Sequence, residues 1–427
     1  MNIALLGCGT VGGGVLSLLT ENADKLAERV GAPLVVERVL VRDLDKPRVA
    51  ECDRRILTRD VDEVLGDPRI HLFVEVMGGE GLAHECIQRA LRANKSVVSA
   101  NKLLLASHAA ELVALAHEHG ADLAFEGAVG GGIPIVRTLR EAFASDRVTG
   151  ITGILNGTSN YVLTRMLDAE LKLNAAVAEA QALGYAEADP TMDVGGHDAA
   201  HKLAILAMLA FGTSVDQPIE PLSGITEIEP VDHRFAERFG YRIKHLVIGR
   251  DHGDDVELRV HPALIPERSV LANVSGVLNA VLLEGRALGP CLVYGQGAGA
   301  LPTAVSVVSD ILDVARSIVA GVSGLQTRGI KLGRVRPRSE IETRYYIRFS
   351  VSDEPGVMAR LAGALGDQAV SIEAMVQEAR ASVKGGPATV VMLTHHAREA
   401  AVMRALAELA NESFMAEPPH LLRIEDV

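Results

Sequence analysis

The feature that most constrains this chain is a regular alternation of short apolar runs with helical patterns across residues 1–135. The apolar runs are rich in Val, Ile and Leu and lack alternating polar residues, which is typical of parallel strands covered on both faces. Strands that alternate with helices in this way predict an α/β fold with a doubly wound sheet. The expected strands are Asn2–Leu6, Leu34–Val41, His71–Val76, Ser96–Ser99 and Asp122–Phe125, and the expected helices are Val11–Val30, Leu82–Ala93 and His108–His119.

A glycine-rich turn, GCGTVG at residues 7–12, directly follows the first expected strand and begins the first expected helix. In that context the spacing G-x-G-x-x-G is the fingerprint of dinucleotide binding. The first glycine permits the tight turn, the second lets the backbone approach the pyrophosphate, and the third allows close packing of the helix on the sheet. Free N–H groups at the start of the helix then hold the pyrophosphate. The sequence therefore predicts a Rossmann domain that binds NAD or NADP through Gly7, Gly9, Thr10, Val11 and Gly12.

The end of the second expected strand bears on the choice of cofactor. An acidic residue there accepts the ribose 2′-OH of NAD, whereas an arginine accommodates the 2′-phosphate of NADP. Both kinds of residue are present, as Arg42 and Asp43. We predict that NADP is favoured and that Arg42 contacts its 2′-phosphate; the alternative is a solvent-exposed arginine at a strand end.

Composition excludes several classes of function. The net charge of −13 argues against nucleic-acid binding, which depends on neutralising phosphates with Lys and Arg. No apolar run approaches the roughly 18–20 residues needed to span a bilayer, and no signal peptide precedes the glycine turn. The four cysteines lie far apart in the sequence, which favours free thiols in a reducing compartment. We therefore expect a soluble cytoplasmic oxidoreductase with no membrane or nucleic-acid partner.

Three further regions follow the predicted Rossmann domain, which we assign to residues 1–135. Residues 136–301 mix helices and strands and predict an α+β catalytic and dimerisation domain, and a long apolar helix at 302–320 is expected to return to the Rossmann domain. A basic, polar stretch at 331–343 predicts a linker. Residues 344–427 show the order β-α-β-β-α-β, which indicates a ferredoxin-like module.

Ligands of open α/β sheets bind beyond the carboxyl ends of the strands. Three sequence features follow expected strands: Gly78 in MGGE, Ala100 and Lys102 in SANK, and Glu126 with the glycine-rich loop 127–134. Lys102 is either a site lysine or an ordinary surface lysine. The loop after Glu126 is either a hinge between domains or, through its carbonyls and one carboxylate, a site for a hard cation.

The segment at residues 184–202 is the richest in chemistry. Asp198 and Lys202 are spaced i, i+4 and so share one helix face, and the apolar turns that follow favour a cleft over a surface ion pair. His197 and His201 have the same spacing, but a zinc site is disfavoured because no third ligand is evident. A lysine placed by carboxylates can move the proton that accompanies hydride transfer. With Glu187 and Asp198 for an ammonium group and Lys102 for a carboxylate or the reacting oxygen, the residues indicate an amino-acid-like substrate.

The motifs ALLGCGTVGGGV, VEVMGGE, SANK, EGAVGGGIPI, ILNGTSNY, GYAEADPTMDVGGHDAAHKLAILA and GQGAGALPTA occur in this order along essentially the whole chain. Together they closely resemble homoserine dehydrogenase of the monofunctional bacterial type. The resemblance implies NAD(P)-dependent interconversion of L-homoserine and L-aspartate 4-semialdehyde, in the biosynthesis of threonine, methionine and isoleucine. It further implies a set of residue roles: Lys202 as proton donor and acceptor with Lys102 as the second catalytic lysine; Glu187, Asp198, Asp193 and Thr158 for substrate; Gly184, Gly297 and Gly299 over the cofactor; and Glu126, Val129, Gly131 and Ile133 for sodium.

The C-terminal module beginning at DEPGV, residues 353–357, resembles an ACT domain. The resemblance implies feedback inhibition by L-threonine, bound near Pro355-Gly356 between paired modules, in a homodimer or homotetramer. The alternative is a module that only aids dimerisation. Two other functions stay open from the residues: a different amino-acid dehydrogenase on the same scaffold, and a non-catalytic regulator that responds to NAD(P) and an amino acid.

Overall fold

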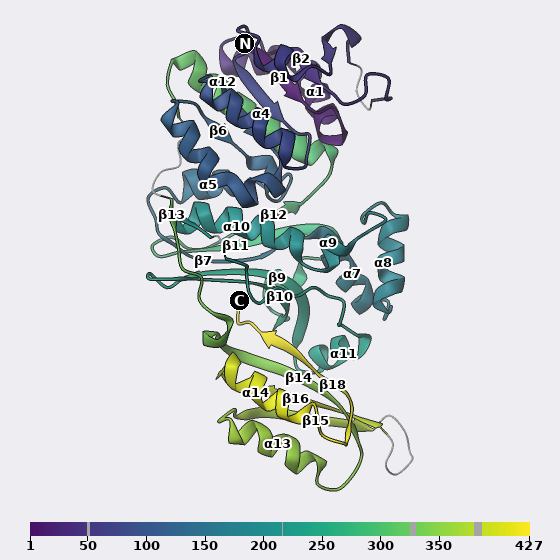
Figure 1. Ribbon diagram of the computed structural model, residues 1–427. Helices are drawn as coiled ribbons and strands as arrows, with labels where there is room; N and C mark the ends of the chain where they lie inside the picture. The colour runs from purple at the N-terminus through teal and green to yellow at the C-terminus, as the bar shows by residue number, and fades with distance from the viewer. Residues whose placement is uncertain (49–51, 216, 325–329, 380–386) are drawn as a thin grey trace. The chain divides into compact units, whose positions relative to one another are not determined.

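The computed structural model describes residues 1–48, 52–215, 217–324, 330–379 and 387–427 (Figure 1). The chain divides into two compact units, and each is built from three separate stretches of sequence. The first unit comprises Met1–Ile151, His201–Gln217 and Leu278–Gly333, and the second comprises Thr152–Ala200, Pro218–Val277 and Arg334–Val427.

The first unit is organised around a six-stranded parallel sheet in the order β3-β2-β1-β4-β5-β6, which is the doubly wound Rossmann order. Its strands are β1 (Asn2–Leu6), β2 (Val35–Leu40), β3 (Leu57–Thr58), β4 (Leu72–Glu75), β5 (Ser96–Ser99) and β6 (Leu123–Ala124). The continuous apolar runs are explained by this arrangement, because every residue of β4 and β5 is buried. The α/β fold class predicted from the sequence is confirmed.

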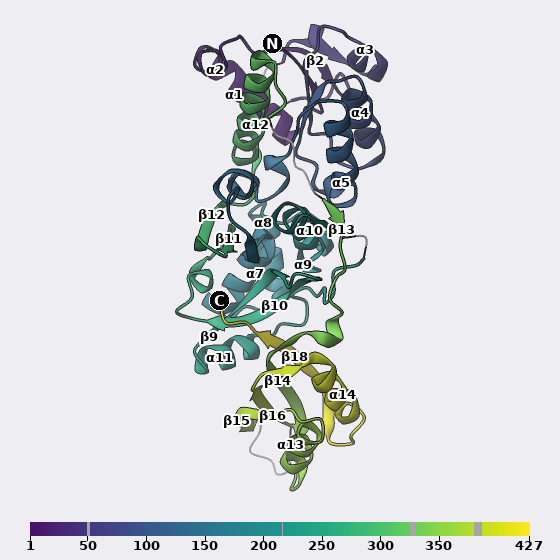
Figure 2. The same cartoon turned by 90° about the vertical axis from the view of Figure 1, so that its left-hand side faces the viewer.

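Helices cover both faces of this sheet (Figure 2). On one face lie α1 (Thr10–Glu21), α2 (Ala23–Val30) and α12 (Ala300–Ala320), and on the other lie α3 (Val61–Leu65), α4 (Gly81–Arg92) and α5 (Lys102–Glu118). The helix expected at 302–320 is α12, and it packs against α1 in one core with β1. A helix from the C-terminal half of the chain thus covers part of one face of the N-terminal sheet.

One expected helix, Val11–Val30, is in fact two. It is interrupted at Asn22, which has the non-helical angles φ −114° and ψ 18° and separates α1 from α2. The Asn22 side chain donates to the Leu18 carbonyl at 3.1 Å, so it supplies a partner for one carbonyl of the last turn of α1. The apolar spacing continues across the break, and for that reason periodicity alone predicts a single helix.

Smaller elements complete the first unit. They are the short helix α6 (Ile135–Arg137), which continues as a π-helical turn at Thr138–Ala142, the hairpin of β11 (Leu278–Gly285) and β12 (Gly289–Gln296), and the parallel pair of β8 (Thr213–Ser214) with β13 (Lys331–Leu332). Two elements, β7 (Val148–Ile154) and α10 (His197–Phe211), contain the points where the chain passes between the units.

The second unit contains six strands in the order β9-β10-β18-β14-β16-β15. The bounds of these strands are β9 (Tyr241–Asp251), β10 (Val256–Pro266), β14 (Glu342–Ser352), β15 (Ile372–Ala379), β16 (Pro387–Thr394) and β18 (Met415–Ile424). The helices of the second unit are α7 (Gly157–Asp168), α8 (Leu173–Ala182), α9 (Thr191–Val194), α11 (Pro230–Arg238), α13 (Val357–Asp367) and α14 (Glu399–Leu409). The C-terminal part shows the expected β-α-β-β-α-β order, with the two-residue strand β17 (Ala397–Arg398) added before α14.

The ferredoxin-like module shares a sheet with the rest of the second unit. Its last strand, β18, pairs with β14 on one side and runs parallel to β10 on the other, where Ala263 lies opposite Arg423. One face of the module's sheet packs against the module's own helices, α13 and α14 (Figure 1). The other face of the sheet contributes Tyr346 and Leu422 to a core that also contains Phe235 of α11. The module is therefore an integral part of this unit.

The segment expected to be a linker is ordered over most of its length. Within 331–343 lie β13 and a 3-10 turn at Arg338–Glu340. Val335 forms a bridge with Val256, and the Arg336 guanidinium lies 3.0 Å from the Asp255 carboxylate. These contacts hold the segment against the start of β10.

Candidate active site

The glycine turn has the geometry that dinucleotide binding requires. Gly7 adopts a φ of +102°, which side chains rarely permit, and a Cβ there would lie 2.9 Å from the backbone of Met77. A Cβ on Gly12 would lie 2.3 Å from the Gly7 carbonyl oxygen. Both glycines are therefore fixed by packing of the protein on itself.

Gly9 differs from these two glycines because a Cβ there would meet no atom within 4 Å. It is the N-cap residue of α1, and no side chain caps the helix. The N-terminal N–H groups of α1, beginning at Thr10, are thus left to an anion, and the backbone at Gly9 faces open space. An uncapped helix N-terminus with open space beside it is the arrangement that binds phosphate groups in dinucleotide-binding folds.

The other predicted cofactor residues of the first unit follow parallel strands of the sheet. Arg42 comes after β2, Gly78 after β4, and Ala100 and Lys102 after β5. The structure therefore brings them to the same edge of the sheet as the glycine turn, which follows β1. Lys102 is the first residue of α5 and its side chain is exposed.

A buried glutamate, which sequence reasoning did not single out, links two of these strand ends. Glu75 accepts hydrogen bonds from the Met77 amide at 2.8 Å and from the Ser99 hydroxyl at 2.8 Å. Burial raises the pKa of the Glu75 carboxyl. Asn101 adds a second link, because its side chain donates to the Gly79 carbonyl at 2.5 Å and also caps α5. These contacts set the positions of Gly78 and Lys102.

Arg42 is exposed at the start of the loop after β2. A second arginine, Arg48, organises this loop: its guanidinium donates to the carbonyls of Asp43, Leu44 and Lys46 at 2.5, 3.2 and 2.9 Å. Sequence reasoning missed Arg48, because nothing local distinguishes it from any other surface arginine.

The loop that carries the predicted sodium ligands is buried at every position from Glu126 to Ile133 except Gly132. The Glu126 carboxylate accepts hydrogen bonds from the amides of Val136 at 2.9 Å and Arg137 at 2.7 Å. Burial raises its pKa. The Gly131 carbonyl accepts from the Ser306 hydroxyl at 2.7 Å, so at least one predicted cation ligand already has a protein partner.

Asp310 of α12 is the acidic neighbour of this loop. It accepts the Glu126 amide at 2.7 Å, a contact between residues 184 positions apart in the sequence. Burial, followed by repulsion from Glu126, raises the pKa of Asp310 to about 7. Arg137 lies 3.6 Å from Asp310 and 2.5 Å from Asp313, so the cluster combines buried acids with arginine.

Gly297 and Gly299 lie in the loop between β12 and α12. A Cβ on Gly131 would come within 2.6 Å of the Gly297 carbonyl oxygen, and the Gly132 amide donates to Gln296 at 3.1 Å. The structure thus brings this loop directly against the loop after Glu126. Gly299 has a φ of +126° and is the N-cap residue of α12.

The predicted catalytic helix is α10. Asp198 and Lys202 lie one turn apart on it, and their relative exposures are only 4% and 7%. A solvent-exposed surface ion pair, the alternative left open by the sequence, is therefore wrong. The apolar residues that follow, such as Leu203 and Leu206, are fully buried and hold this helix in place.

Asn156 ties the acidic residues of the second unit together. Its side-chain nitrogen donates to Asp193 at 2.8 Å and to Asp198 at 2.9 Å, while its oxygen accepts from the Ser159 amide at 2.8 Å and caps α7. The Thr158 hydroxyl lies 3.2 Å from Asp193. Three of the four residues predicted to bind substrate are thus joined in one network. The motif ILNGTSNY contains Asn156, but nothing in its local sequence distinguishes this residue from an ordinary helix cap.

The remaining predicted residues of the second unit lie outside this network. Glu187 is exposed in the loop between α8 and α9, and its main-chain carbonyl accepts a hydrogen bond from Gln181. Gly184 is exposed, has a φ of +76° and follows α8.

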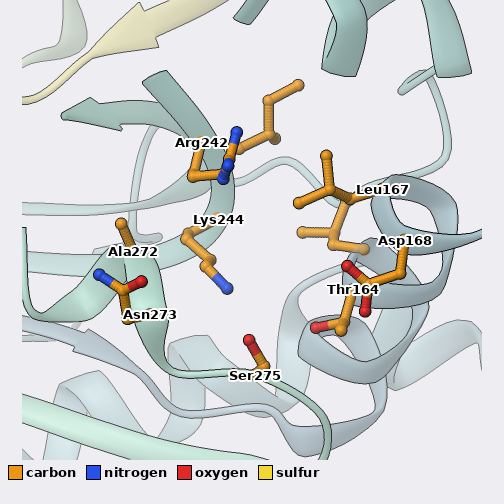
Figure 3. A pocket seen from close by; sticks show the side chains of 10 residues that line it. Thr164, Leu167, Asp168, Arg242, Lys244, Ala272, Asn273 and Ser275 are labelled. Carbon is orange, nitrogen blue, oxygen red and sulfur yellow. The ribbon is translucent and has the colours of Figure 1, made fainter. Parts of the chain in front are cut away.

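A polar pocket of the second unit contains none of the predicted site residues. It has a volume of about 140 Å³ and lies between α7, the start of β9 and the segment 272–275. Figure 3 shows Lys244, Thr164 and Asp168 directed toward the same space. The Lys244 amino group donates to the Val274 carbonyl at 2.7 Å, and burial lowers its pKa to about 8. The hydrogen-bond partner of Lys244 is thus a main-chain carbonyl outside the predicted substrate network.

Two general expectations can be compared with the structure. All four cysteines are free thiols, as predicted. Within the described ranges, no helix is both long enough and apolar enough to cross a membrane.

Comparisons with known proteins agree with this geometry. A family model described as the NAD-binding domain of homoserine dehydrogenase matches residues 7–126, the homoserine dehydrogenase model matches 134–312, and the ACT domain model matches 345–411. Homoserine dehydrogenase of Neisseria gonorrhoeae is 40% identical over 433 residues, with 100% of this chain and 99% of that protein covered.

Solved structures give the same result. The crystal structure of a homoserine dehydrogenase from Thiobacillus denitrificans matches with a TM-score of 0.91 at 41% identity and covers 100% of this chain and 98% of that one. A hyperthermophilic archaeal homoserine dehydrogenase mutant in complex with NADPH matches with a TM-score of 0.62 at 26% identity, over 73% of this chain and 97% of that one. With a Rossmann sheet, with Asp198 and Lys202 buried one turn apart on α10, and with relatives that span its full length, this chain belongs to the homoserine dehydrogenase family of NAD(P)-dependent oxidoreductases.

Proposed function

We propose that the chain interconverts L-homoserine and L-aspartate 4-semialdehyde with Lys202 as the group that moves the proton. The single observation that supports this most is the placement of Lys202 one turn after Asp198 on α10, with both side chains buried. Burial removes both groups from bulk water, so the lysine can exchange its proton with a bound alcohol instead of with solvent.

The nicotinamide cofactor supplies the hydride chemistry when it is bound. In the oxidative direction, Lys202 accepts the proton of the homoserine hydroxyl, and in the reductive direction it returns that proton to the oxygen. Lys102 contributes a second positive charge toward the substrate carboxylate or the reacting oxygen. Asp198 and Glu187 bind the substrate ammonium group, with Asp193 and Thr158 supporting.

The proposal is tested by homoserine-dependent reduction of NADP⁺ with purified wild type and Lys202→Ala. Loss of the proton-transfer group lowers kcat by about 10²–10⁴-fold. Lys25→Ala, an exposed lysine of α2 in the first unit, is the matched control and retains wild-type turnover. Cofactor affinity, measured by NADPH fluorescence, separates a chemical defect from a folding defect. Wild-type kcat in Lys202→Ala would refute the assignment of Lys202.

For the cofactor, NADP is preferred and Arg42 binds its 2′-phosphate. Support comes from the exposed position of Arg42 after β2 and from the loop that Arg48 orders beside it. Gly9, with the amides of Thr10 and Val11, holds the pyrophosphate, while Gly7 and Gly12 shape the turn. Gly78, Ala100, Gly184, Gly297 and Gly299 line the rest of the dinucleotide. Arg42→Ala should lower the ratio of kcat/KM with NADP⁺ to that with NAD⁺ by at least tenfold, whereas Arg54→Ala, also exposed, should leave it unchanged. An unaltered ratio in Arg42→Ala would contradict the role of Arg42.

For the monovalent cation, the loop at 126–133 binds sodium through Glu126 and the carbonyls of Val129, Gly131 and Ile133. The donor set fits a hard cation, since it consists of oxygens only. The Ile133 carbonyl accepts the Ile135 amide at 2.8 Å, and each carbonyl has a second lone pair for an ion. Burial of this loop supports the proposal, because oxygens shielded from bulk water can replace the hydration shell of an ion. Sodium should raise the melting temperature of wild type more than that of Glu126→Gln.

For regulation, L-threonine binds the C-terminal module at the turn that precedes α13. Gly356 there has a φ of +97°, and the Asp353 carboxylate accepts a hydrogen bond from Gln377 of β15 at 3.1 Å. Asp353→Ala should raise the threonine concentration for half inhibition at least tenfold, whereas Asp367→Ala at the other end of α13 should not. Deletion of the module is a poor test, because it would strip β18 from β10.

The assembly and cellular setting proposed from the sequence are a cytoplasmic homodimer or homotetramer in the pathway to threonine, methionine and isoleucine. The family assignment supports this reading over the two alternative functions, a different amino-acid dehydrogenase and a non-catalytic regulator. Either alternative function would be favoured if the purified protein showed no homoserine-dependent reduction of NAD(P)⁺.

A further inference from the structure

A group of three potential metal ligands lies in the first unit, where α4 packs on α5. His84 comes from α4, and His108 and Glu111 come from α5. One ligand atom of each residue lies within 4.8 Å of the others. None of the three belongs to the residues assigned to cofactor, substrate or sodium. We propose that they bind one divalent transition-metal ion of the Zn²⁺ type.

The helices place these ligands by simple spacing. His108 and Glu111 are three residues apart on α5 and therefore share one face of that helix. His84 reaches them from α4, and its ring stacks on that of His108 with centroids 4.2 Å apart and an interplanar angle of 22°. Two imidazoles and a carboxylate from two packed helices thus lie within reach of one ion.

The distances match a tetrahedral site. The Glu111 Oε2 atom lies 3.6 Å from His84 Nε2 and 3.5 Å from His108 Nδ1. With metal–ligand bonds of about 2.0–2.2 Å, ligand atoms on a tetrahedral zinc ion lie about 3.3–3.5 Å apart. Two of the three edges are therefore within a few tenths of an ångström of the metal-bound values. The third edge joins the imidazole nitrogens, which lie within 4.8 Å of each other, and binding one ion requires the two rings to turn out of their stacked arrangement so that both nitrogen lone pairs point to it.

The surroundings suit an ion with one open coordination position. The relative exposures of the His84, His108 and Glu111 side chains are 22%, 34% and 51%, so water can supply a fourth ligand. Gln88, one turn after His84, donates to the other carboxylate oxygen of Glu111 at 2.5 Å and orients it. Imidazole and carboxylate ligands select Zn²⁺, Cu²⁺ or Ni²⁺ over Mg²⁺ and Ca²⁺, which prefer oxygen ligands alone.

An ion at this point would clamp α4 to α5. Both helices begin beside residues already linked to each other, since Asn101 before α5 bonds to the Gly79 carbonyl before α4. The metal adds a second link, one to two turns further along, and therefore stabilises the folded first unit, because the ligands come together only there.

The test uses the full-length chain without a histidine tag, titrated with ZnCl₂ by calorimetry in a non-coordinating buffer at pH 7.5. Wild type should bind one Zn²⁺ at this site, and His84→Ala, His108→Ala and Glu111→Gln should each weaken that binding at least tenfold. His117→Ala removes an exposed histidine from the same helix and should bind like wild type. The melting temperature should rise with Zn²⁺ in wild type and His117→Ala, and not in His84→Ala/His108→Ala.

Substitution of Co²⁺ provides a second readout that does not depend on stability. A tetrahedral site with two imidazole ligands gives visible absorption bands, which should appear in wild type and be lost in His84→Ala. Equal Zn²⁺ affinity in wild type and the double variant, or Co²⁺ bands that survive in the double variant, would overturn the site.

Discussion

Arg348 and Asp232 form a buried ion pair, with the guanidinium Nε 2.8 Å from the carboxylate Oδ1 and side-chain exposures of 6% and 0%. Arg348 lies on β14 of the C-terminal module and Asp232 lies in the first turn of α11. The Tyr346 hydroxyl donates to the same carboxylate at 2.9 Å. The module is thus joined to the rest of the second unit by charges withdrawn from water, in addition to its shared sheet.

Arg348→Met should destabilise the protein by about 3–5 kcal/mol, because it leaves the Asp232 carboxylate buried with no opposite charge. Unfolding in urea, followed by circular dichroism, measures the change. Arg348→Met/Asp232→Asn should recover part of the loss, since the second substitution removes the stranded charge. A single variant as stable as wild type would show that the pair is not energetically coupled.

Gly12 and Gly9 should respond differently to alanine. Gly12→Ala forces a methyl group against the Gly7 carbonyl and should cost about 1–3 kcal/mol of stability. Gly9→Ala meets open space, so its melting temperature should match that of wild type while NADPH affinity falls, because the methyl group stands where the pyrophosphate approaches. Thermal unfolding and NADPH fluorescence titration of both variants check this pair. The prediction is wrong if Gly9→Ala binds NADPH as wild type does.

Asp310 should make stability fall as the pH rises from about 4 to about 7. Its folded pKa of about 7 exceeds the ordinary aspartate value, so the folded state binds a proton over that interval that the unfolded state has lost. Below about pH 4 the carboxyl is protonated in both states and contributes no such change. Asp310→Asn removes the ionisation, so its stability relative to wild type should increase with pH across the same interval and then level off.

Melting temperatures of wild type and Asp310→Asn at pH 4.5, 6 and 8 would measure this difference. Asp313→Asn, on the same helix and less buried, serves as the control. A difference between Asp310→Asn and wild type that stays constant with pH would contradict the raised pKa of Asp310.

Asn156→Asp should impair turnover through the substrate network. The substitution keeps the oxygen that caps α7 but replaces the donor shared by Asp193 and Asp198 with a third acid. Repulsion among three carboxylates should displace Asp198 and lower kcat/KM for homoserine at least tenfold, with a loss of about 1–3 kcal/mol in stability. Steady-state kinetics measure the effect, and Asn411→Asp, at an exposed position just after α14, should be neutral. Unchanged kcat/KM in Asn156→Asp would place Asp198 outside the reaction.

Local sequence patterns were enough to predict the Rossmann sheet and the burial of Asp198 and Lys202 on α10. Continuous apolar runs such as that of β4 are local signals, because both faces of a parallel strand are covered. The spacing of Asp198 and Lys202 is local as well, since one helical turn separates them. The break at Asn22 was missed because the apolar period continues across it while a single side chain ends the helix.

Only the tertiary structure decided which distant residues meet. Asp310 reaches Glu126 across 184 positions, Asn156 joins Asp193 and Asp198, and β18 pairs with β10. Periodicity describes how one element presents its own faces, and it carries no information about which face of another element will cover them. For that reason the motifs predict which residues form the site, whereas the contacts that position those residues are not predictable from the motifs.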